Sequence, residues 1–438
     1  MHTRRHAGTL SRSGRPWRRA LSSAALERLL IVDHCAIVGG QDKRTGGLAG
    51  RFSAAQAAFA GIFIVTGLGL LSVGATLPIL PRYVSGPLGG GDLEVGIVTG
   101  AFAITGLACR PLAGHLADRR GRKRVVLVGS LLTAVSGLLL FVPAGIVGVI
   151  ASRLFLGAGE GAVYTAGSAW IVDLAPPERR GRIIGLYGLA IWGGLALGPP
   201  LGELVLHASS FDWVWAVATA APLLGALVAI RIPERFRPRH DYEYERALLA
   251  REALRPGLGL ALGIVGYAAM AAFVVLHLDQ RAIGHGAAVF AAFAVSVVAM
   301  RVVGGWLPDR YGSIRCAIGA ALVEAAGLVV IAAADSFAAA LIGAMAMGAG
   351  FSLLFPSLAL LVVNRVPEER RGVAMGTFTA FFDLGMGVGG PLAGAAAALG
   401  GYSAAFALAA ACALATVAVA LTLRRASAGL PAPAPAPP

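Results

Sequence analysis

An arginine, a glutamate and a tyrosine are spaced at helical intervals within the apolar segment 145–171. Arg153 and Glu160 are seven residues apart, close to two turns of about 3.6 residues each, and Tyr164 extends the same face. An ionisable group costs about 2.5–3.5 kcal/mol at the centre of a bilayer, so such residues are usually functional. The spacing therefore predicts Glu160 as a titratable proton carrier whose charge state Arg153 adjusts. A fixed ion pair that only joins helices is the alternative.

Asp383 is a second candidate for proton coupling, because it stands alone as an acid in the apolar segment 373–397. Two other acids are given less weight. Glu203, with His207 four residues later, is expected in an exposed vestibule, and Glu324 receives no role.

The polar segment from Gly114 to Lys123 separates two apolar stretches and combines glycine, acid and cations. Gly114 allows two helices to approach closely, and Gly121 permits a tight reversal between them. Asp118 is able to accept N–H bonds at the N-terminus of a neighbouring helix, where negative charge is favourable. The segment is predicted to act as a gate, the alternative being arginines that only fix membrane orientation. The predicted gating residues of this loop and of a similar later loop are Gly114, Asp118, Arg119, Gly121, Arg122, Asp309 and Arg310.

Helices that cross a membrane must position these residues. Of the 438 residues, 57% are hydrophobic and only 14% are charged, whereas soluble proteins carry about 25% charged residues. Many apolar segments have about 20 residues, enough to cross about 30 Å of hydrocarbon. The sequence predicts an all-α integral membrane protein and excludes soluble enzymes, collagen-like chains and disulfide scaffolds. Twelve spans are expected, at 55–80, 93–114, 124–143, 145–171, 183–206, 212–231, 257–277, 286–306, 314–334, 337–362, 373–397 and 402–423.

Basic residues alternate between the connecting loops, which places both termini in the cytoplasm of a multi-pass protein of the plasma or inner membrane. The net charge of +14 is thus a topology signal and not a nucleic-acid site. Four cysteines lie far apart, and the sequence predicts no metal site and no cofactor. The expected organisation is a disordered basic extension (1–53), a six-helix bundle (54–231), a cytoplasmic loop (232–256), a second six-helix bundle (257–425) and a Pro/Ala-rich tail (426–438).

The two bundles are expected to be repeats of one unit. Arg110 matches Arg301, and Gly157 matches Gly348, each pair lying 191 residues apart, and several loop residues share this offset. Two six-helix halves around a central site are a known transporter plan. Arg301 is expected to be structural, because its mate Arg110 lies beside a loop.

Three motifs give the sequence a resemblance to a known family over about residues 54–425. The loop Gly-His-Leu-Ala-Asp-Arg-Arg-Gly-Arg-Lys from Gly114 to Lys123 is similar to the most specific motif of the major facilitator superfamily. The segment from Arg153 to Gly159 resembles its span-four motif. A span-five pattern resembles that of the drug/proton antiporter branch, which exports compounds; its residues are Gly185, Gly194, Gly198, Pro199 and Gly202.

The resemblance implies a latch between Asp118 and span eleven in the outward-open state, and a span-five contact that closes the cavity to protons. It also implies a cavity lined by spans one, four, seven and ten. The matching residues suit a lipophilic neutral or cationic substrate. They are Tyr164, Trp192, Tyr267, Met270, Phe351 and Phe355.

The sequence thus predicts a monomeric transporter that exports small lipophilic compounds in exchange for protons, with lipid around it. An importer, or a carrier of sugars or organic acids, is the alternative within transport. A membrane-embedded enzyme or a sensor is the alternative of another class, and no nucleophile-and-base set or phosphate-binding loop supports it. The chain is therefore predicted not to be an enzyme.

Overall fold

The computed structural model describes residues 54–174, 180–234, 250–367 and 370–428. All regular structure in these ranges is helical, from α3 to α15. The predicted extension at 1–53, most of the loop at 232–256 and the end of the tail lie outside the described residues.

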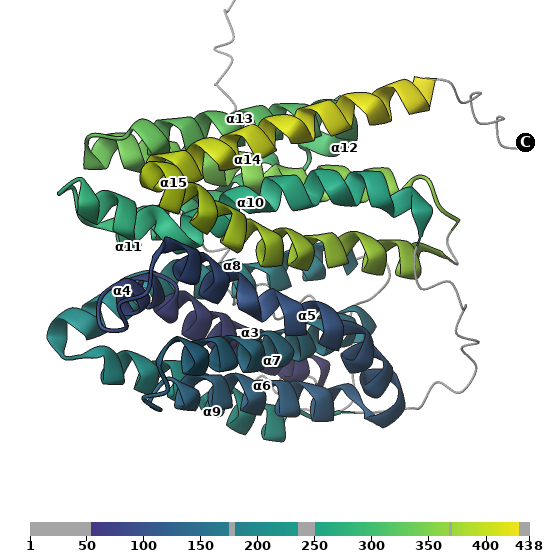
Figure 1. Cartoon of the computed structure of the whole chain (residues 1–438). Coiled ribbons are helices and arrows are strands. Elements are labelled where there is room, and N and C mark those ends of the chain that lie inside the picture. Colours follow the sequence, from purple (N-terminus) through teal and green to yellow (C-terminus); the bar gives the residue numbers. More distant parts are fainter. Residues whose placement is uncertain (1–53, 175–179, 235–249, 368–369, 429–438) are drawn as a thin grey trace, which may run out of the picture.

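The first half of the chain forms one bundle, drawn from purple to teal in Figure 1. A short break at Leu77 and Pro78 divides its first span into two helices. The helices are α3 (Ala54–Thr76), α4 (Ile79–Ser85), α5 (Asp92–Arg120), α6 (Arg122–Leu139), α7 (Gly145–Leu174), α8 (Arg180–Ala208) and α9 (Phe211–Arg231).

The second half forms the other bundle, drawn in green and yellow (Figure 1). Its last helix covers two spans, because the backbone leaves helical geometry at Gly400 and Gly401 and the chain turns back. Gly401 has a φ of 73°, which glycine adopts without the cost of a Cβ. The helices are α10 (Arg251–Gln280), α11 (Gly286–Gly304), α12 (Leu307–Tyr311), α13 (Ser313–Ala333), α14 (Phe337–Val363) and α15 (Arg371–Ala428).

The helices of the described chain account for the twelve predicted spans. Ten segments are long and apolar enough to cross a membrane, and the last of them contains both arms of α15. The remaining span is α6, whose first turn holds Arg122, Lys123 and Arg124. The prediction of an all-α protein with two six-helix halves is confirmed.

The duplication is visible in the packing of each half. Gly157 of α7 lies against the carbonyl of Phe102 with no room for a Cβ, and Gly348 of α14 lies in the same way against the carbonyl of Phe293. Both members of each contact are offset by 191 residues. The two halves therefore repeat their tertiary contacts as well as their motifs.

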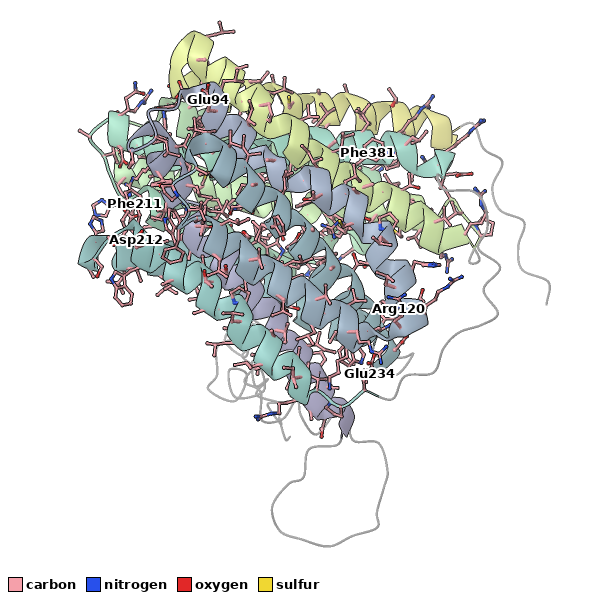
Figure 2. All side chains as sticks on the ribbon, turned by 60° about the horizontal axis from the view of Figure 1, so that its bottom comes forward. Glu94, Arg120, Phe211, Asp212, Glu234 and Phe381 are labelled. Atoms are coloured by element: carbon pink, nitrogen blue, oxygen red, sulfur yellow. The ribbon has the colours of Figure 1, made fainter. Side chains whose placement is uncertain are left out.

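The two ends of the bundle differ in charge. Figure 2 shows Arg120 and Glu234 at one end, and Glu94, Phe211 and Asp212 at the other. We call the first the basic end, because α5 ends there with Arg119 and Arg120 and α6 begins there with Arg122, Lys123 and Arg124. We call the second the opposite end. The positive-inside rule predicts that the basic end faces the cytoplasm.

Candidate functional site

A cavity lies between the two halves, and both contribute to its wall. The structure places both candidate acids, Glu160 and Asp383, on this wall. Met270, which was expected to line the cavity, is instead fully buried in the core of the second half. The other five residues that were expected there do line it: Tyr164, Trp192, Tyr267, Phe351 and Phe355.

An ion pair between the halves lies at this wall. Arg110 of α5 donates two hydrogen bonds to Asp383 of α15, at 2.6 Å from Nε to Oδ2 and 3.0 Å from Nη2 to Oδ1. Asp383 is only 1% exposed, so a negative charge on its carboxylate would be costly without the paired arginine. The paired geometry is the fork that an arginine offers to a carboxylate.

Glu160 of α7 lies at the edge of the same ion pair. Its Oε2 is 3.8 Å from Nη2 of Arg110, longer than a hydrogen bond. One cation therefore faces two carboxylates in a largely buried place. A proton bound to one of the acids would remove the unmatched negative charge.

Arg153 does not take the place beside Glu160 that the sequence predicted. It is 2% exposed, and its Cζ lies 5.4 Å from the centre of the Phe102 ring. Side chains on a helix point toward its N-terminus, so the long arginine side chain leads away from Glu160 two turns later. The cation beside Glu160 is therefore Arg110, which corrects the prediction.

Arg301 was expected to be structural because its mate Arg110 lies beside a loop, but the structure places both arginines on the cavity wall. Arg110 also lies over the ring of Tyr164, with its Cζ 5.0 Å from the ring centre. The duplication carried a signal that pointed to them: both halves keep an arginine at the same place in an apolar helix.

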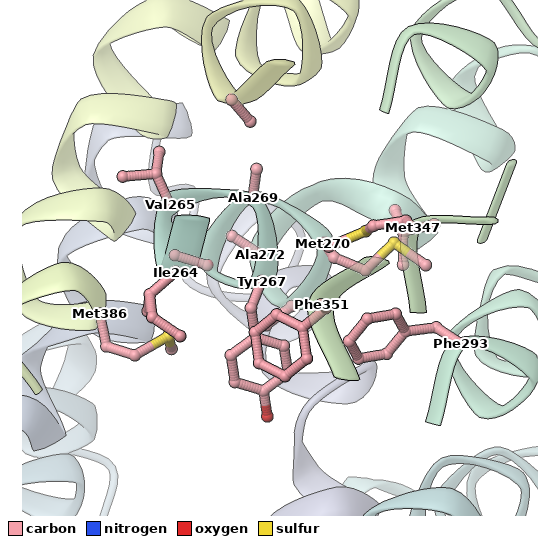
Figure 3. Packing of buried hydrophobic residues seen from close by; sticks show 14 of the residues in the cluster. Ile264, Val265, Tyr267, Ala269, Met270, Ala272, Phe293, Met347, Phe351 and Met386 are labelled. Atoms are coloured by element: carbon pink, nitrogen blue, oxygen red, sulfur yellow. The ribbon is translucent and has the colours of Figure 1, made fainter. Parts of the chain in front are cut away.

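Aromatic rings from both halves, Trp192 of α8 with Tyr267 and Phe351 of the second half, form another part of the wall. The ring of Trp192 lies 5.5 Å from Phe351 and 6.2 Å from Tyr267, and Phe293 packs behind them. Figure 3 shows Tyr267, Phe293 and Phe351 grouped beside one another. This part of the cavity offers ring faces to an apolar or aromatic molecule.

At the opposite end, a network of charges joins the halves. Arg82 of α4 pairs with Glu203 of α8 at 2.5 Å and with Asp279 of α10 at 2.8 Å, so it connects the two bundles. Glu203 is thus a paired residue, while His207 lies 3.4 Å from it and is mostly exposed.

A close backbone contact joins the halves near the same end. Gly96 of α5 meets Gly390 of α15 with no room for a Cβ on either residue. Gly96 precedes Arg110 along α5, so this glycine contact lies between the cavity and the opposite end.

At the basic end, the predicted gating loop makes its described contacts within its own half. The Asp118 side chain is 54% exposed and lies 3.7 Å from Arg122. The acid at the N-terminus of α6 is Glu234, which accepts hydrogen bonds from the N–H groups of Arg122 and Lys123 at 2.6 and 3.1 Å. The sequence signal missed this residue because it lies far from the loop along the chain.

The remaining predicted gating residues lie in the two loop regions. Gly121 and Gly312 make the turns at positive φ, of 97° and 88°. In the second loop, Arg310 lies near the rings of Trp306 and Tyr311. Asp309 and Arg119 are exposed, and Gly114 faces Thr165 of α7.

The span-five glycines make close contacts inside the first half. Gly194, Gly198 and Gly202 of α8 lie against the backbone of α3 near Gly67, Gly74 and Ala75. A Cβ at any of the three would clash with this backbone, so the small residues bring the helices together. Gly185 and Pro199 are in the same helix.

Comparison with known proteins now identifies the family. The model of the Major Facilitator Superfamily matches residues 62–278 and 258–438. The chain belongs to this superfamily and is a multi-pass membrane transporter.

A relative in Salmonella typhimurium (strain LT2), described as an uncharacterized MFS-type transporter, is 37% identical over 350 residues, covering 77% of this chain and 89% of the relative. Among solved structures, a mutant of the nucleoside transporter NupG is similar with a TM-score of 0.71 and 14% identity. The human organic anion transporter MFSD10 is similar with a TM-score of 0.64 and 19% identity. Each match covers 84% of this chain and 99% of the solved chain. At these identities the solved structures support the fold.

Proposed function

We propose that this transporter exports small, largely apolar compounds in exchange for protons, by alternating access. The observation that carries the proposal is the group of one cation and two acids between the halves, formed by Arg110, Asp383 and Glu160. A proton site that also joins the halves links its charge state to their relative position.

Glu160 is the proposed proton carrier. Asp383 accepts two short hydrogen bonds from Arg110, whereas Glu160 lies 3.8 Å from the same guanidinium. The less strongly paired acid is the easier one to protonate. Protonation of Glu160 then leaves Arg110 and Asp383 as a neutral pair.

In the proposed cycle, the structure represents the conformation that faces the cytoplasm. The opposite end is closed by Arg82 and by Gly96 against Gly390, and substrate enters from the basic end. Closure of the basic end would bring the Asp118 loop to the start of α15, as the predicted latch requires. The span-five contact of α8 with α3 keeps the first half rigid during this motion.

The proposal includes the organisation expected from the sequence: a monomer in the plasma or inner membrane, a cytoplasmic loop near residues 232–256, and both termini in the cytoplasm. Reporter tags at residue 240 and at the C-terminus should both report the cytoplasm. A tag near Ser209 should report the other side. Two adjacent loops on the same side would contradict the count of twelve spans.

Transport in everted vesicles under an imposed pH gradient tests the coupling, with lipophilic cations, neutral antibiotics and aromatic acids as probes. Glu160→Gln should abolish accumulation against a gradient and spare binding and passive exchange. Glu160→Asp should keep partial coupling with a shifted pH profile. Accumulation by Glu160→Gln at the wild-type level would move the proton role to Asp383.

A second candidate function, proton-coupled uptake of an organic acid, is favoured by one observation. Arg301 lines the cavity beside the carbonyl of Ser352 at 3.4 Å, without an acid in ion-pair contact among the described residues. Transport assays in vesicles of both orientations decide between the two functions. Uptake predicts that substrate accumulates in right-side-out vesicles, and export predicts that it accumulates in everted vesicles.

A further inference from the structure

The two halves contribute unlike residues at equivalent places on the cavity wall. The offset of 191 residues relates Arg110 to Arg301, Glu160 to Phe351, Tyr164 to Phe355, and Trp192 to Asp383. All eight of these residues line the cavity. The duplication thus gives two comparable sites, of which one has acids and the other has aromatic rings at the equivalent positions.

The two arginines have different partners. Arg110 has Asp383 at hydrogen-bond distance and Glu160 at 3.8 Å. The residue that corresponds to Asp383 beside Arg301 is Trp192, and Phe351 takes the place of Glu160. Within the described chain, Arg301 therefore has no acid partner.

Arg301 is also poorly satisfied by hydrogen bonds. Its Nη2 lies 3.4 Å from the carbonyl oxygen of Ser352, near the limit of a hydrogen bond, and its Nε is buried without a partner in the described chain. A cation in such a place is costly unless a charge or an acceptor meets it. A ligand that enters the cavity is able to supply that acceptor.

Aromatic residues that line the same cavity as Arg301 define the rest of the ligand. Trp192, Tyr267 and Phe351 lie within 6.2 Å of one another, measured between ring centres, and form an apolar wall of the same cavity. Ring faces suit an aromatic or flat apolar body. An arginine fork suits a carboxylate or a sulfonate.

We propose that Arg301, Trp192, Tyr267 and Phe351 form a subsite for the anionic group and ring of an amphiphilic aromatic acid. The proposal rests on the proposed function, since it names the substrate class of the same cavity, and it holds for either direction of transport. It replaces the neutral or cationic substrate that the sequence alone favoured.

Equilibrium binding to the purified full-length protein tests the subsite without any gradient. The probes are naphthalene-2-carboxylate, its neutral amide and naphthalene-2-methylammonium, which share one ring system. The carboxylate should bind about tenfold more tightly than the amide, the usual effect of a hydrogen bond to a charged group. The ammonium should bind more weakly than both.

Substitutions at Arg301 locate the preference. Arg301→Gln should bind carboxylate and amide equally, whereas Arg301→Lys should keep part of the preference because it keeps the charge. Arg315→Gln removes an exposed arginine at the start of α13 and should leave the preference unchanged.

Restoring the missing acid gives a second and independent test. Trp192→Asp places a carboxylate at the position equivalent to Asp383 and should pair with Arg301, which abolishes the preference for the anion. Trp192→Asn introduces a side chain of the size of aspartate but without its charge. It should keep the preference for the carboxylate, with weaker binding of all three probes because the ring is lost.

Equal binding of carboxylate and amide by the wild type, no binding of any probe, or an unchanged preference in Arg301→Gln would overturn the subsite. These results leave the proton role of Glu160 untouched, because Glu160→Gln is judged by accumulation against a gradient. Conversely, the Glu160→Gln variant should still bind the carboxylate more tightly than the amide, whichever group carries the proton.

Discussion

The opposite end and the basic end hold their helices together in different ways. At the opposite end, Arg82 pairs with Asp279 across the halves, and Gly96 lies against Gly390. At the basic end, the described ion pairs stay inside one half: Arg122 with Asp173 in the first, and Arg370 with Glu252 in the second. Contacts inside a half keep each bundle rigid, while contacts between halves must break and form again.

In the proposed alternating access, the halves move as two bodies. The contacts that join them include ion pairs and glycine backbone contacts. Substitutions at each end should therefore have distinct effects on opening and on stability.

The largest effect is expected from Gly390→Val. A side chain at this position would clash with the carbonyl of Gly96 and the backbone of Gly100, so closure of the opposite end becomes less favourable. Overpacking of this kind costs about 1–3 kcal/mol, which corresponds to roughly a tenfold loss of the closed state. Transport should fall by a similar factor, and a cysteine introduced at Ser85 should become more accessible to a polar reagent.

Gly376→Val is the matched control, since a Cβ at Gly376 of the same helix meets no atom within 4 Å. It should transport normally. Equal losses in the two variants would show that the glycines of α15 matter for helix formation and not for closure.

The next largest effect is expected from Asp118→Asn. The side chain is 54% exposed here, so the variant should fold with a stability within about 0.5 kcal/mol of wild type. Transport should fall severalfold, because the neutral amide weakens the proposed latch to the N-terminus of α15 when the basic end closes. Uptake measurements at matched expression check this.

Asp309→Asn in the equivalent loop is the comparison for Asp118→Asn, and a smaller loss is expected because the second loop lacks the basic segment after Gly312. Full activity of Asp118→Asn would contradict the gating role of the first loop and leave its arginines the role of fixing the orientation in the membrane.

A moderate effect is expected from the Arg82 network. Asp279 belongs to the other half and Glu203 to the same half as Arg82, so only Asp279→Asn removes a contact between the halves. Asp279 is 36% exposed, and a partly exposed pair contributes about 0–1 kcal/mol. Accessibility of a cysteine at Ser85 should rise up to about fivefold in Asp279→Asn, and less in Glu203→Gln. The reverse order would place the closing contact elsewhere.

Most of the fold was predictable from the sequence, because each span is a long apolar segment and the duplication repeats its motifs. One exception, the break in the first span, has a local cause. The Pro78 region divides the first span into α3 and α4, whereas the turn at Gly400 and Gly401 lies between the predicted spans 373–397 and 402–423 and agrees with them. The break at Leu77 and Pro78 leaves the apolar pattern of the first span unchanged, so the pattern did not reveal it.

The candidate site was predictable only in part. Glu160 and Asp383 could be found because acids are rare in apolar segments, but their partner could not. Which arginine reaches an acid depends on side-chain direction and on contacts across the halves, as Arg110 and Arg153 show. Glu324 shows the same limit: it is fully buried, and in the described chain neither carboxylate oxygen has a hydrogen-bond partner, whereas the equivalent residue of the first half is Thr133.

The smallest effect is expected from Glu234→Gln at the basic end. One oxygen of Glu234 accepts from two backbone N–H groups at the start of α6, where the helix dipole also favours a negative charge. The amide oxygen of glutamine can still accept these bonds, so the loss should be about 0.5–1 kcal/mol of stability, the size of a weak cap effect. Thermal unfolding of the purified protein measures it, with the exposed Asp335→Asn as control. Because the contact lies within the first half, the accessibility of a cysteine at Ser85 and the transport rate should stay at the wild-type level. A changed accessibility would mean that this acid takes part in moving the halves, and the contrast between the two ends would then no longer hold.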